Sequence, residues 1–344
     1  MSNAANIHYL PVREDWLARR TEEPLEPGLP IVDPHHHLWD RPDWRYLLPD
    51  LLADTNQGHS IVGTVFVQCR AMHRATGPEA MKPVGETEFV NGVAAMSASG
   101  GYGPTRVCEG IVGHVDLTIG AAAREVLEAH IRAGGGRFRG IRHITAWDPD
   151  PVIMNPAYTP PRDILFRDEF RAGFAQLAPL GLSFDAWLYH PQIPDLTALA
   201  RAFPETNIVL DHVGGPLGIR GYAGQRDEVF RGWRAAMAEL ATCPNVCVKL
   251  GGLGMRINGM GFEDKADPPS SDELAAAWKP WIETTIGLFG AGRCMFESNF
   301  PVDKGSYGYG VFWNACKKLA AGAGAEETAM LFAGTAQRFY RLGD

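Results

Sequence analysis

The sequence lacks the marks of several large classes of proteins. No apolar run approaches the ~20 residues that a helix needs to span a bilayer. The opening stretch, MSNAANIHYLPVRED, has no basic segment followed by an apolar one, so we expect no secretory signal. Basic residues are outnumbered by acidic ones, 32 to 40, and the formal charge is −8. Nucleic acids and anionic membranes attract clustered Lys and Arg, so we expect neither as a partner.

Cysteines are few and scattered. Of the six, only Cys243 and Cys247 lie close together, and no second pair completes a zinc-binding set. Reduced thiols in a cytoplasmic protein are the simplest interpretation. With 344 residues, 45% of them apolar, the chain is long enough for one large domain or two smaller ones.

Signature motifs of common enzyme classes are also missing. No stretch fits G-x-G-x-x-G, G-x-x-x-x-G-K-[ST], G-x-S-x-G or H-E-x-x-H. These patterns bind dinucleotides or nucleoside triphosphates, present a nucleophilic serine, or hold a catalytic zinc ion. Their absence disfavours nucleotide-binding proteins, serine hydrolases and zinc proteases of the corresponding types.

What the chain does contain is a regular alternation of two patterns. Short apolar runs typical of buried strands alternate with segments of helical spacing. The predicted strands cover residues 31–37, 61–68, 107–115, 138–144, 182–189, 207–212, 245–250 and 293–298. The predicted helices cover residues 86–99, 121–133, 166–179, 193–203, 226–242, 272–289, 311–321 and 325–340.

This alternation predicts an α/β fold with a parallel sheet and right-handed crossovers. Eight such units favour a single (β/α)8 TIM barrel over residues 31–344, with an N-terminal arm over 1–30 and helices at the C-terminus. A doubly wound open sheet is the alternative. Its first strand is normally followed by a glycine-rich phosphate turn, whereas this chain has DPHHHLWD there.

Polar side chains gather where the predicted strands end, which is where such barrels place their catalytic groups. Histidine accounts for 11 of the 344 residues, and most of these histidines lie at strand ends. The strand-end residues are His35, His36, His37, Gln68, Arg70, His114, Asp116, Arg142, His143, His190, His212, Lys249, Glu297, Asn299 and, just beyond, Asp303. Their concentration predicts a polar site at the carboxyl end of the barrel.

The run of three histidines divides by strand geometry. Alternate residues of a strand face the same way, so we expect His35 and His37 to point into the barrel mouth and His36 to pack outside. Two imidazoles two residues apart can bind one divalent ion. They can also form a satisfied polar layer, because two ligands alone do not make a metal site.

Four motifs resemble those of the amidohydrolase superfamily, in its amidohydrolase-2 branch. VDPHHH is similar to the D-x-H-x-H signature, and LDHVGGP (210–216) to the D-H-x-G-x-P segment. FESNFPVD (296–303) resembles the S-D-W-P-type motif, and FRGIRH (138–143) the G-[IV]-R segment of a lactonase-like subgroup. The resemblance spans residues 31 to 340 and implies a (β/α)8 barrel. It also implies hydrolysis of lactones, or decarboxylation or hydration of small carboxylated metabolites.

The same resemblance implies roles for individual residues. His35, His37 and His190 would be metal ligands when a metal is present. His212 would orient or protonate the attacked group. An acid after the eighth strand would be both a ligand and the general base that activates water.

The sequence departs from the family at that acid. Asn299 stands where most members have Asp, and an amide neither accepts a proton at neutral pH nor binds zinc well. Asp303, four residues on, or Glu297, two residues before, could serve instead. The cofactor is then either one divalent ion, zinc or manganese, or none. Without a metal, the histidines and Arg142 would polarise the carbonyl while an acid activates water.

Four strand-end residues are candidates for substrate binding. Arg142 and His143 suit a carboxylate or carbonyl group, and Lys249 suits an anion. Gln68 is a weaker candidate, because an amide at a strand end often only satisfies backbone groups. Arg142 and Lys249 also have a structural alternative, since ion-pair networks place charges in clefts too.

These observations predict a hydrolase that opens a small carboxylated lactone. The expected partner is a small anionic substrate, and the arm leaves a homo-oligomer open. A metal-dependent decarboxylase or hydratase on the same barrel is the alternative within enzymes. A catalytically reduced homologue that only binds a ligand is the alternative from another class, and Asn299 is the residue that favours it.

Overall fold

Eight parallel strands form the centre of the protein. The computed structural model describes residues 8–42 and 44–343, and its large sheet has the order β1-β4-β5-β6-β7-β8-β9-β10. The sheet closes on itself through backbone hydrogen bonds from Asn299 N to His35 O (2.9 Å) and from His37 N to Phe300 O (2.8 Å). The strands are β1 (Pro30–His36), β4 (Ser60–Val67), β5 (Arg106–Gly113), β6 (Phe138–Ile141), β7 (Ser183–Ala186), β8 (Ile208–Leu210), β9 (Val246–Leu250) and β10 (Cys294–Phe296). The predicted (β/α)8 barrel is confirmed.

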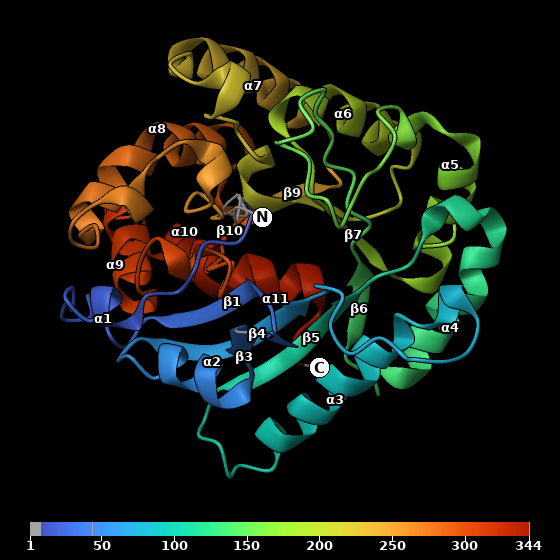
Figure 1. Ribbon diagram of the computed structural model, residues 1–344, viewed down its shortest axis with the longest axis horizontal. Helices are drawn as coiled ribbons and strands as arrows, with labels where there is room; N and C mark the ends of the chain where they lie inside the picture. The colour runs from blue at the N-terminus through green and yellow to red at the C-terminus, as the bar shows by residue number, and fades with distance from the viewer. Residues whose placement is uncertain (1–7, 43, 344) are drawn as a thin grey trace.

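Helices surround the barrel and connect its strands (Figure 1). Those that follow the successive strands are α3 (Val84–Ala98), α4 (Ala123–Ala133), α5 (Asp168–Phe174), α6 (Ile193–Ala202), α7 (Arg226–Leu240), α8 (Ser271–Phe289) and α9 (Tyr309–Leu319). The last predicted helix, 325–340, is divided into α10 (Ala325–Ala329), a π-helical turn (Met330–Gly334) and α11 (Thr335–Tyr340). Between β1 and β4 lie α2 (Leu48–Thr55) and a hairpin of β2 (Trp39–Arg41) and β3 (Trp44–Tyr46), which were not predicted.

The start of α8 shows how the local sequence sets an element. The Ser270 hydroxyl accepts a hydrogen bond from Glu273 N (3.3 Å), and the Glu273 carboxylate accepts one from Ser270 N (2.8 Å). This reciprocal cap satisfies N–H groups that the beginning of a helix leaves without partners. The helix then buries Trp278, Trp281 and Ile282 against its neighbours.

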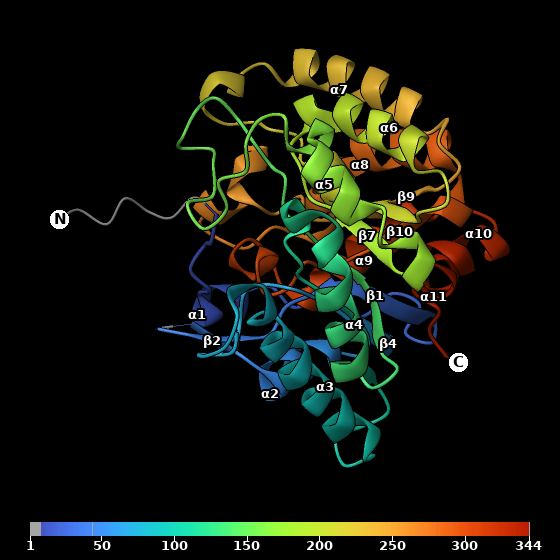
Figure 2. The same ribbon diagram turned by 90° about the vertical axis from the view of Figure 1, so that its right-hand side faces the viewer.

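Two layers of apolar side chains hold the barrel together. The larger layer lies between strands and helices and includes Phe66, Phe184 and Trp233. The smaller one joins Val32 and Val209 of the strands with Tyr340 of α11. Figure 2 shows α11 and the N-terminal arm on opposite sides of the barrel. The mouth on the arm's side is therefore the end of the barrel opposite α11.

The arm before β1 is fastened to the outside of the barrel. Trp16, in the short helix α1 (Glu14–Leu17), donates its indole N–H to the Ala266 carbonyl at 3.1 Å. Farther along, the Glu22 carboxylate accepts a hydrogen bond from Ser271 N at 2.8 Å. These contacts tie the arm to the start of α8 and to the loop before it.

Within the described part of the chain, no helix combines the length and the apolar character needed to cross a membrane.

Candidate active site

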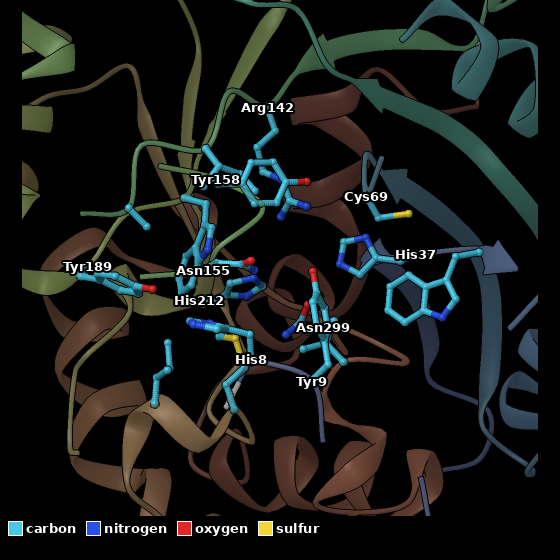
Figure 3. A pocket seen from close by; sticks show the side chains of 17 residues that line it. His8, Tyr9, His37, Cys69, Arg142, Asn155, Tyr158, Tyr189, His212 and Asn299 are labelled. Atoms are coloured by element: carbon cyan, nitrogen blue, oxygen red, sulfur yellow. The ribbon is translucent and has the colours of Figure 1, made fainter. Parts of the chain in front are cut away.

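A cavity opens where the strands of the barrel end (Figure 3). The space within it, including a part that is open to solvent, amounts to about 680 Å³. Strand ends and the loops beyond them supply most of its lining. The polar lining residues are His8, His37, Cys69, Arg142, Asn155, His212 and Asn299, and the aromatic ones are Tyr9, Trp39, Tyr158, Trp187 and Tyr189.

Below the floor of this cavity, the Glu297 carboxylate joins two histidines. Its Oε1 accepts hydrogen bonds from His212 Nδ1 at 2.6 Å and from His212 N at 3.0 Å. Its Oε2 lies 2.7 Å from His35 Nδ1. Burial would raise the pKa of Glu297, but the His212 and His35 imidazoles outweigh burial and lower it to about 2. The carboxylate is therefore ionised at neutral pH and holds the His212 Nδ1 proton toward itself.

Arg142 contacts His35 from the other side. Its Nη1 lies 3.2 Å from His35 Nε2, while Lys249 Nζ lies 3.1 Å from His35 Nδ1, so each ring nitrogen faces a cation that can only donate. Burial and the Lys249 ammonium lower the pKa of His35 to about 4, so its imidazole is neutral at pH 7. The remaining Arg142 contacts are Nη1 to Asp211 Oδ2 (3.4 Å) and Nη2 to the Gln68 carbonyl (2.5 Å).

A fully buried cluster of charges lies beneath these groups. Lys249 Nζ lies 2.6 Å from Asp185 Oδ2, 3.1 Å from Asp211 Oδ1 and 3.1 Å from His35 Nδ1. The Tyr340 hydroxyl donates to the same Asp185 oxygen at 2.7 Å. Lys249 has no exposed surface. It therefore acts on the cavity through His35 and Asp211 and does not reach a ligand held there.

His212 owes its position to an unusual turn. Strand β8 ends at Leu210, and the next residues turn with positive φ angles of 55° at His212 and 47° at Val213. Non-glycine residues adopt such angles rarely, and they do so most often at functional sites. The ring then packs edge-on against Trp187, with centroids 4.7 Å apart. Because Nδ1 is held by Glu297, the other nitrogen, Nε2, is the one left for the cavity.

Asn299 also faces the cavity, and Asp303 lies behind it. Asn299 Nδ2 donates to Asp303 Oδ1 at 3.0 Å, which leaves the amide oxygen for the cavity. The other oxygen, Asp303 Oδ2, accepts from Tyr307 Oη (2.5 Å) and Gly254 N (3.0 Å). Burial raises the pKa of Asp303 to about 6 against these hydrogen bonds. Asp303 is fully buried, so Asn299 separates it from the cavity.

The three consecutive histidines have different surroundings. The His35 and His37 rings meet edge to face, with centroids 5.0 Å apart. His37 Nδ1 bonds the Val67 carbonyl at 2.7 Å, and its ring stacks on Trp39. His36 is buried and bonds Thr64 Oγ1 at 2.8 Å.

Three other predicted residues lie apart from this group. His190 Nδ1 accepts from Leu217 N at 3.2 Å, and its ring packs against Tyr222 rather than beside His35. His143 Nδ1 accepts from Leu117 N at 3.2 Å and lines a neighbouring cavity. The side chain of Gln68 is buried and contacts the Tyr158 hydroxyl at 3.5 Å.

Several residues of the site were missed in the sequence. Asp211 was not among the predicted site residues, and the turn after β8 brings its side chain and that of His212 to the same group. Asp185, on β7, was read only as part of an apolar run. Most of the aromatic walls come from loops and the N-terminal arm, for which a single sequence gives little signal, whereas Trp39 comes from β2.

One group of side chains could hold a metal ion. The ligand atoms of His35, Asp211 and His212 lie within 4.8 Å of one another, and all three residues are buried. Imidazole and carboxylate donors suit zinc and manganese. The donor set thus fits a divalent ion chemically. Binding one through His35 Nε2 would displace the Arg142 guanidinium that now lies 3.2 Å away.

Comparisons with known proteins agree on one relationship. The model of a protein family described as Amidohydrolase matches residues 32–342. An uncharacterized protein of Sinorhizobium fredii is 32% identical over 91% of this chain and 98% of its own. The L-fucono-1,5-lactonase of Burkholderia ambifaria is 26% identical over 90% of this chain and 95% of its own. A crystal structure of an amidohydrolase from Burkholderia multivorans with bound zinc is similar at a TM-score of 0.70 and 25% identity, over 91% of this chain and 99% of that one.

Proposed function

The chain is a hydrolase of the amidohydrolase family, and on that premise we propose that it opens a lactone by attack of water at the mouth of its barrel. The observation that carries this proposal is the pair formed by His212 and Glu297. The carboxylate accepts from His212 Nδ1 at 2.6 Å, so Nε2 presents a lone pair to the cavity. A histidine held in this way by a buried carboxylate is a general base.

Arg142 is the donor for the lactone carbonyl. The residue lines the cavity, and contacts of both Nη atoms hold its guanidinium in place. A fixed guanidinium N–H aimed at the carbonyl oxygen stabilises the negative charge that develops there as water attacks.

The attacking water is held between His212 and Asn299. The Asn299 oxygen accepts one water proton, and His212 Nε2 accepts the other and removes it as the water oxygen bonds to the carbonyl carbon. Asp303 is a positioning residue in this scheme, because it holds the Asn299 amide in the orientation that presents its oxygen. At the position where the family motif has an acidic general base, Asn299 thus supplies a group that binds the water.

Collapse of the tetrahedral intermediate completes the reaction. The carbonyl re-forms as the bond to the ring oxygen breaks, and the protonated His212 returns its proton to that oxygen. Glu297 stabilises the imidazolium between these steps. The reaction therefore converts one lactone and one water into one hydroxy acid.

A divalent ion on His35, Asp211 and His212 would, when bound, polarise the carbonyl and lower the pKa of a coordinated water. The chain also places two positive charges of its own at this group. Lys249 lies 3.1 Å from Asp211 Oδ1, and Arg142 lies 3.2 Å from His35 Nε2. We infer that these two cations support the reaction in the absence of a metal.

The lining of the cavity favours a hydroxylated lactone over a carboxylated one. Arg142 is the one Lys or Arg among the described lining residues, and Asp211 already pairs with it at 3.4 Å. A dicarboxylate would need a second cation, and His143 lies in the neighbouring cavity. Aromatic walls with amide and hydroxyl groups suit a ring that carries hydroxyls. L-Fucono-1,5-lactone, the substrate named for two relatives, is such a ring.

Acid release from a panel of lactones tests the proposal. The panel contains L-fucono-1,5-lactone, an unsubstituted six-membered lactone and 2-pyrone-4,6-dicarboxylate, followed with a pH indicator. We expect the hydroxylated lactone to give the highest kcat/KM, by about tenfold or more, which corresponds to about 1.4 kcal/mol. Release of carbon dioxide from carboxylated compounds would instead support a decarboxylase. Ligand binding without turnover would support a binding protein.

A further inference from the structure

We propose that the N-terminal arm belongs to the active site, and that Tyr9 is a specificity-determining residue that binds a hydroxyl group of the substrate. This inference rests on the proposed lactone hydrolysis and names a substrate contact that lies outside the family's matched region. Tyr9 and His8 line the same cavity as His212 and Asn299 (Figure 3).

The arm reaches the cavity along a fixed path. Arg13 Nη2 donates to the Glu263 carbonyl at 2.7 Å. Leu10 is buried against Gly305, where an added Cβ would lie 2.4 Å from Leu10 Cβ. A larger residue at Gly305 would therefore push the arm out, so the barrel is shaped to receive it.

The ring of Tyr9 is held by the hairpin that follows β1. It meets Trp39 and Trp44 edge to face, with centroids 6.1 and 5.8 Å apart. The Arg41 guanidinium lies 4.8 Å from the centre of the Tyr9 ring. His8 lines the same cavity and hydrogen-bonds the backbone of Met154. The arm thus bridges from the hairpin after β1 to the loop after β6.

The Tyr9 hydroxyl is the polar group that this arrangement leaves for a ligand. Three tyrosines line the cavity. Tyr189 donates to the Ile153 carbonyl at 2.8 Å, and Tyr158 contacts Gln68 Oε1 at 3.5 Å. The hydroxyl of Tyr9 makes no hydrogen bond to any residue in 8–42 or 44–343. A held ring with a free hydroxyl is pre-organised to bind a polar substituent at low entropic cost.

The family match begins at residue 32, after the arm. The residues proposed to break the lactone bond all lie within the match, whereas Tyr9 lies outside it. The arm therefore adds substrate selection to a reaction centre that works on the carbonyl alone. This division predicts that changes in Tyr9 alter which ring is accepted and leave the chemistry of ring opening intact.

The test compares two lactones in two variants. L-Fucono-1,5-lactone carries ring hydroxyls, and the unsubstituted six-membered lactone carries none. A neutral hydrogen bond contributes about 0.5–1.5 kcal/mol, so Tyr9→Phe should lower kcat/KM for the hydroxylated lactone by about 2- to 12-fold, mainly through KM. The unsubstituted lactone should be hydrolysed as by the wild type. Tyr102→Phe, which removes a hydroxyl from an exposed tyrosine, is the matched control and should change neither.

A binding measurement separates this inference from the proposed function. L-Fuconate, the hydroxy acid that the reaction would release, is titrated into the wild type and Tyr9→Phe by calorimetry, with thermal unfolding to show that both are folded. Weaker binding to Tyr9→Phe supports the inference even if no lactone is turned over. Equal affinity of the wild type and Tyr9→Phe for L-fuconate, or an equal loss of kcat/KM for both lactones, overturns the role of Tyr9 while leaving the lactonase proposal in place. Absence of binding and turnover in the wild type overturns both.

Discussion

Replacing Glu297 with Gln tests how the reaction centre is held. The carboxylate receives His212 Nδ1 at 2.6 Å and lies 2.7 Å from His35 Nδ1. An amide has one accepting oxygen, so one of the two histidines must face an N–H₂ group. If that histidine is His212, its proton moves to Nε2 and it can no longer accept a proton from water. If it is His35, an N–H₂ group takes the place of the carboxylate oxygen that now lies 2.7 Å from His35 Nδ1.

Either outcome changes the contact between a fully buried carboxylate and a histidine of the reaction centre. In the serine protease triad, the corresponding change from Asp to Asn lowers kcat by about 10⁴. We expect kcat for L-fucono-1,5-lactone to fall by about 10²–10⁴ in Glu297→Gln, which corresponds to about 3 to 5 kcal/mol in the barrier. Steady-state kinetics at pH 7.5 measure this loss, and circular dichroism shows that the variant is folded.

Glu86→Gln is the matched control, because Glu86 is another buried glutamate with a simpler environment. Its Oε1 accepts from Cys69 N (2.9 Å) and Ala71 N (2.8 Å), and a glutamine oxygen can accept both bonds. This variant should keep kcat within about threefold of the wild type, which is a change of less than 1 kcal/mol in the activation barrier. If Glu297→Gln also stays within tenfold, His212 is not the base that Glu297 orients, and the proposed mechanism fails.

Three further predictions concern charge. Treatment with a chelator should lower kcat by less than about threefold, a change of under 1 kcal/mol in the activation barrier, because Lys249 and Arg142 supply positive charge. A larger loss of activity that added zinc restores, with the metal content checked by elemental analysis, would show that a metal ion is required. Lys249→Met should lower the free energy of unfolding by about 3–5 kcal/mol, because Asp185 and Asp211 lose their buried partner; an unchanged midpoint in urea would contradict this. The folded-state pKa of Glu297, about 2 against 4.5, lies below its unfolded value, so its stabilisation is complete above pH 4.5 and is lost as the pH falls toward 2. The stability advantage of the wild type over Glu297→Gln should therefore narrow across that range in denaturant titrations.

The barrel could be predicted from the sequence because each of its strands is a short apolar run that ends in polar residues. Periodicity reports such local features directly. How deep a side chain lies within the barrel is not determined by the local sequence. Lys249 was a candidate both for a substrate contact at the mouth and for a structural ion pair; it is the fourth residue of β9, has no exposed surface and pairs with Asp185 and Asp211. Its distance from the cavity depends on how far β9 extends relative to the neighbouring strands, which spacing along one strand does not give.

The candidate ligand set was predictable only where the backbone stayed regular. Strand β7 ends at Ala186, so His190 lies four residues into a loop that carries its ring to Tyr222. Strand β8 ends at Leu210, and the left-handed turn at His212 places Asp211 beside it. In both places, tertiary contacts rather than the strand period decide where the side chain points. The aromatic walls and the arm follow from long-range packing in the same way.

The most direct test of the proposed mechanism is the rate of lactone opening by His212→Asn. Asparagine tolerates the positive φ of 55° at this position better than most residues, and it cannot take a proton from water. We expect the folded, chelator-treated wild type to hydrolyse L-fucono-1,5-lactone and kcat to fall by about 10²–10⁴ in His212→Asn, as for loss of a general base. Full activity in His212→Asn would contradict it.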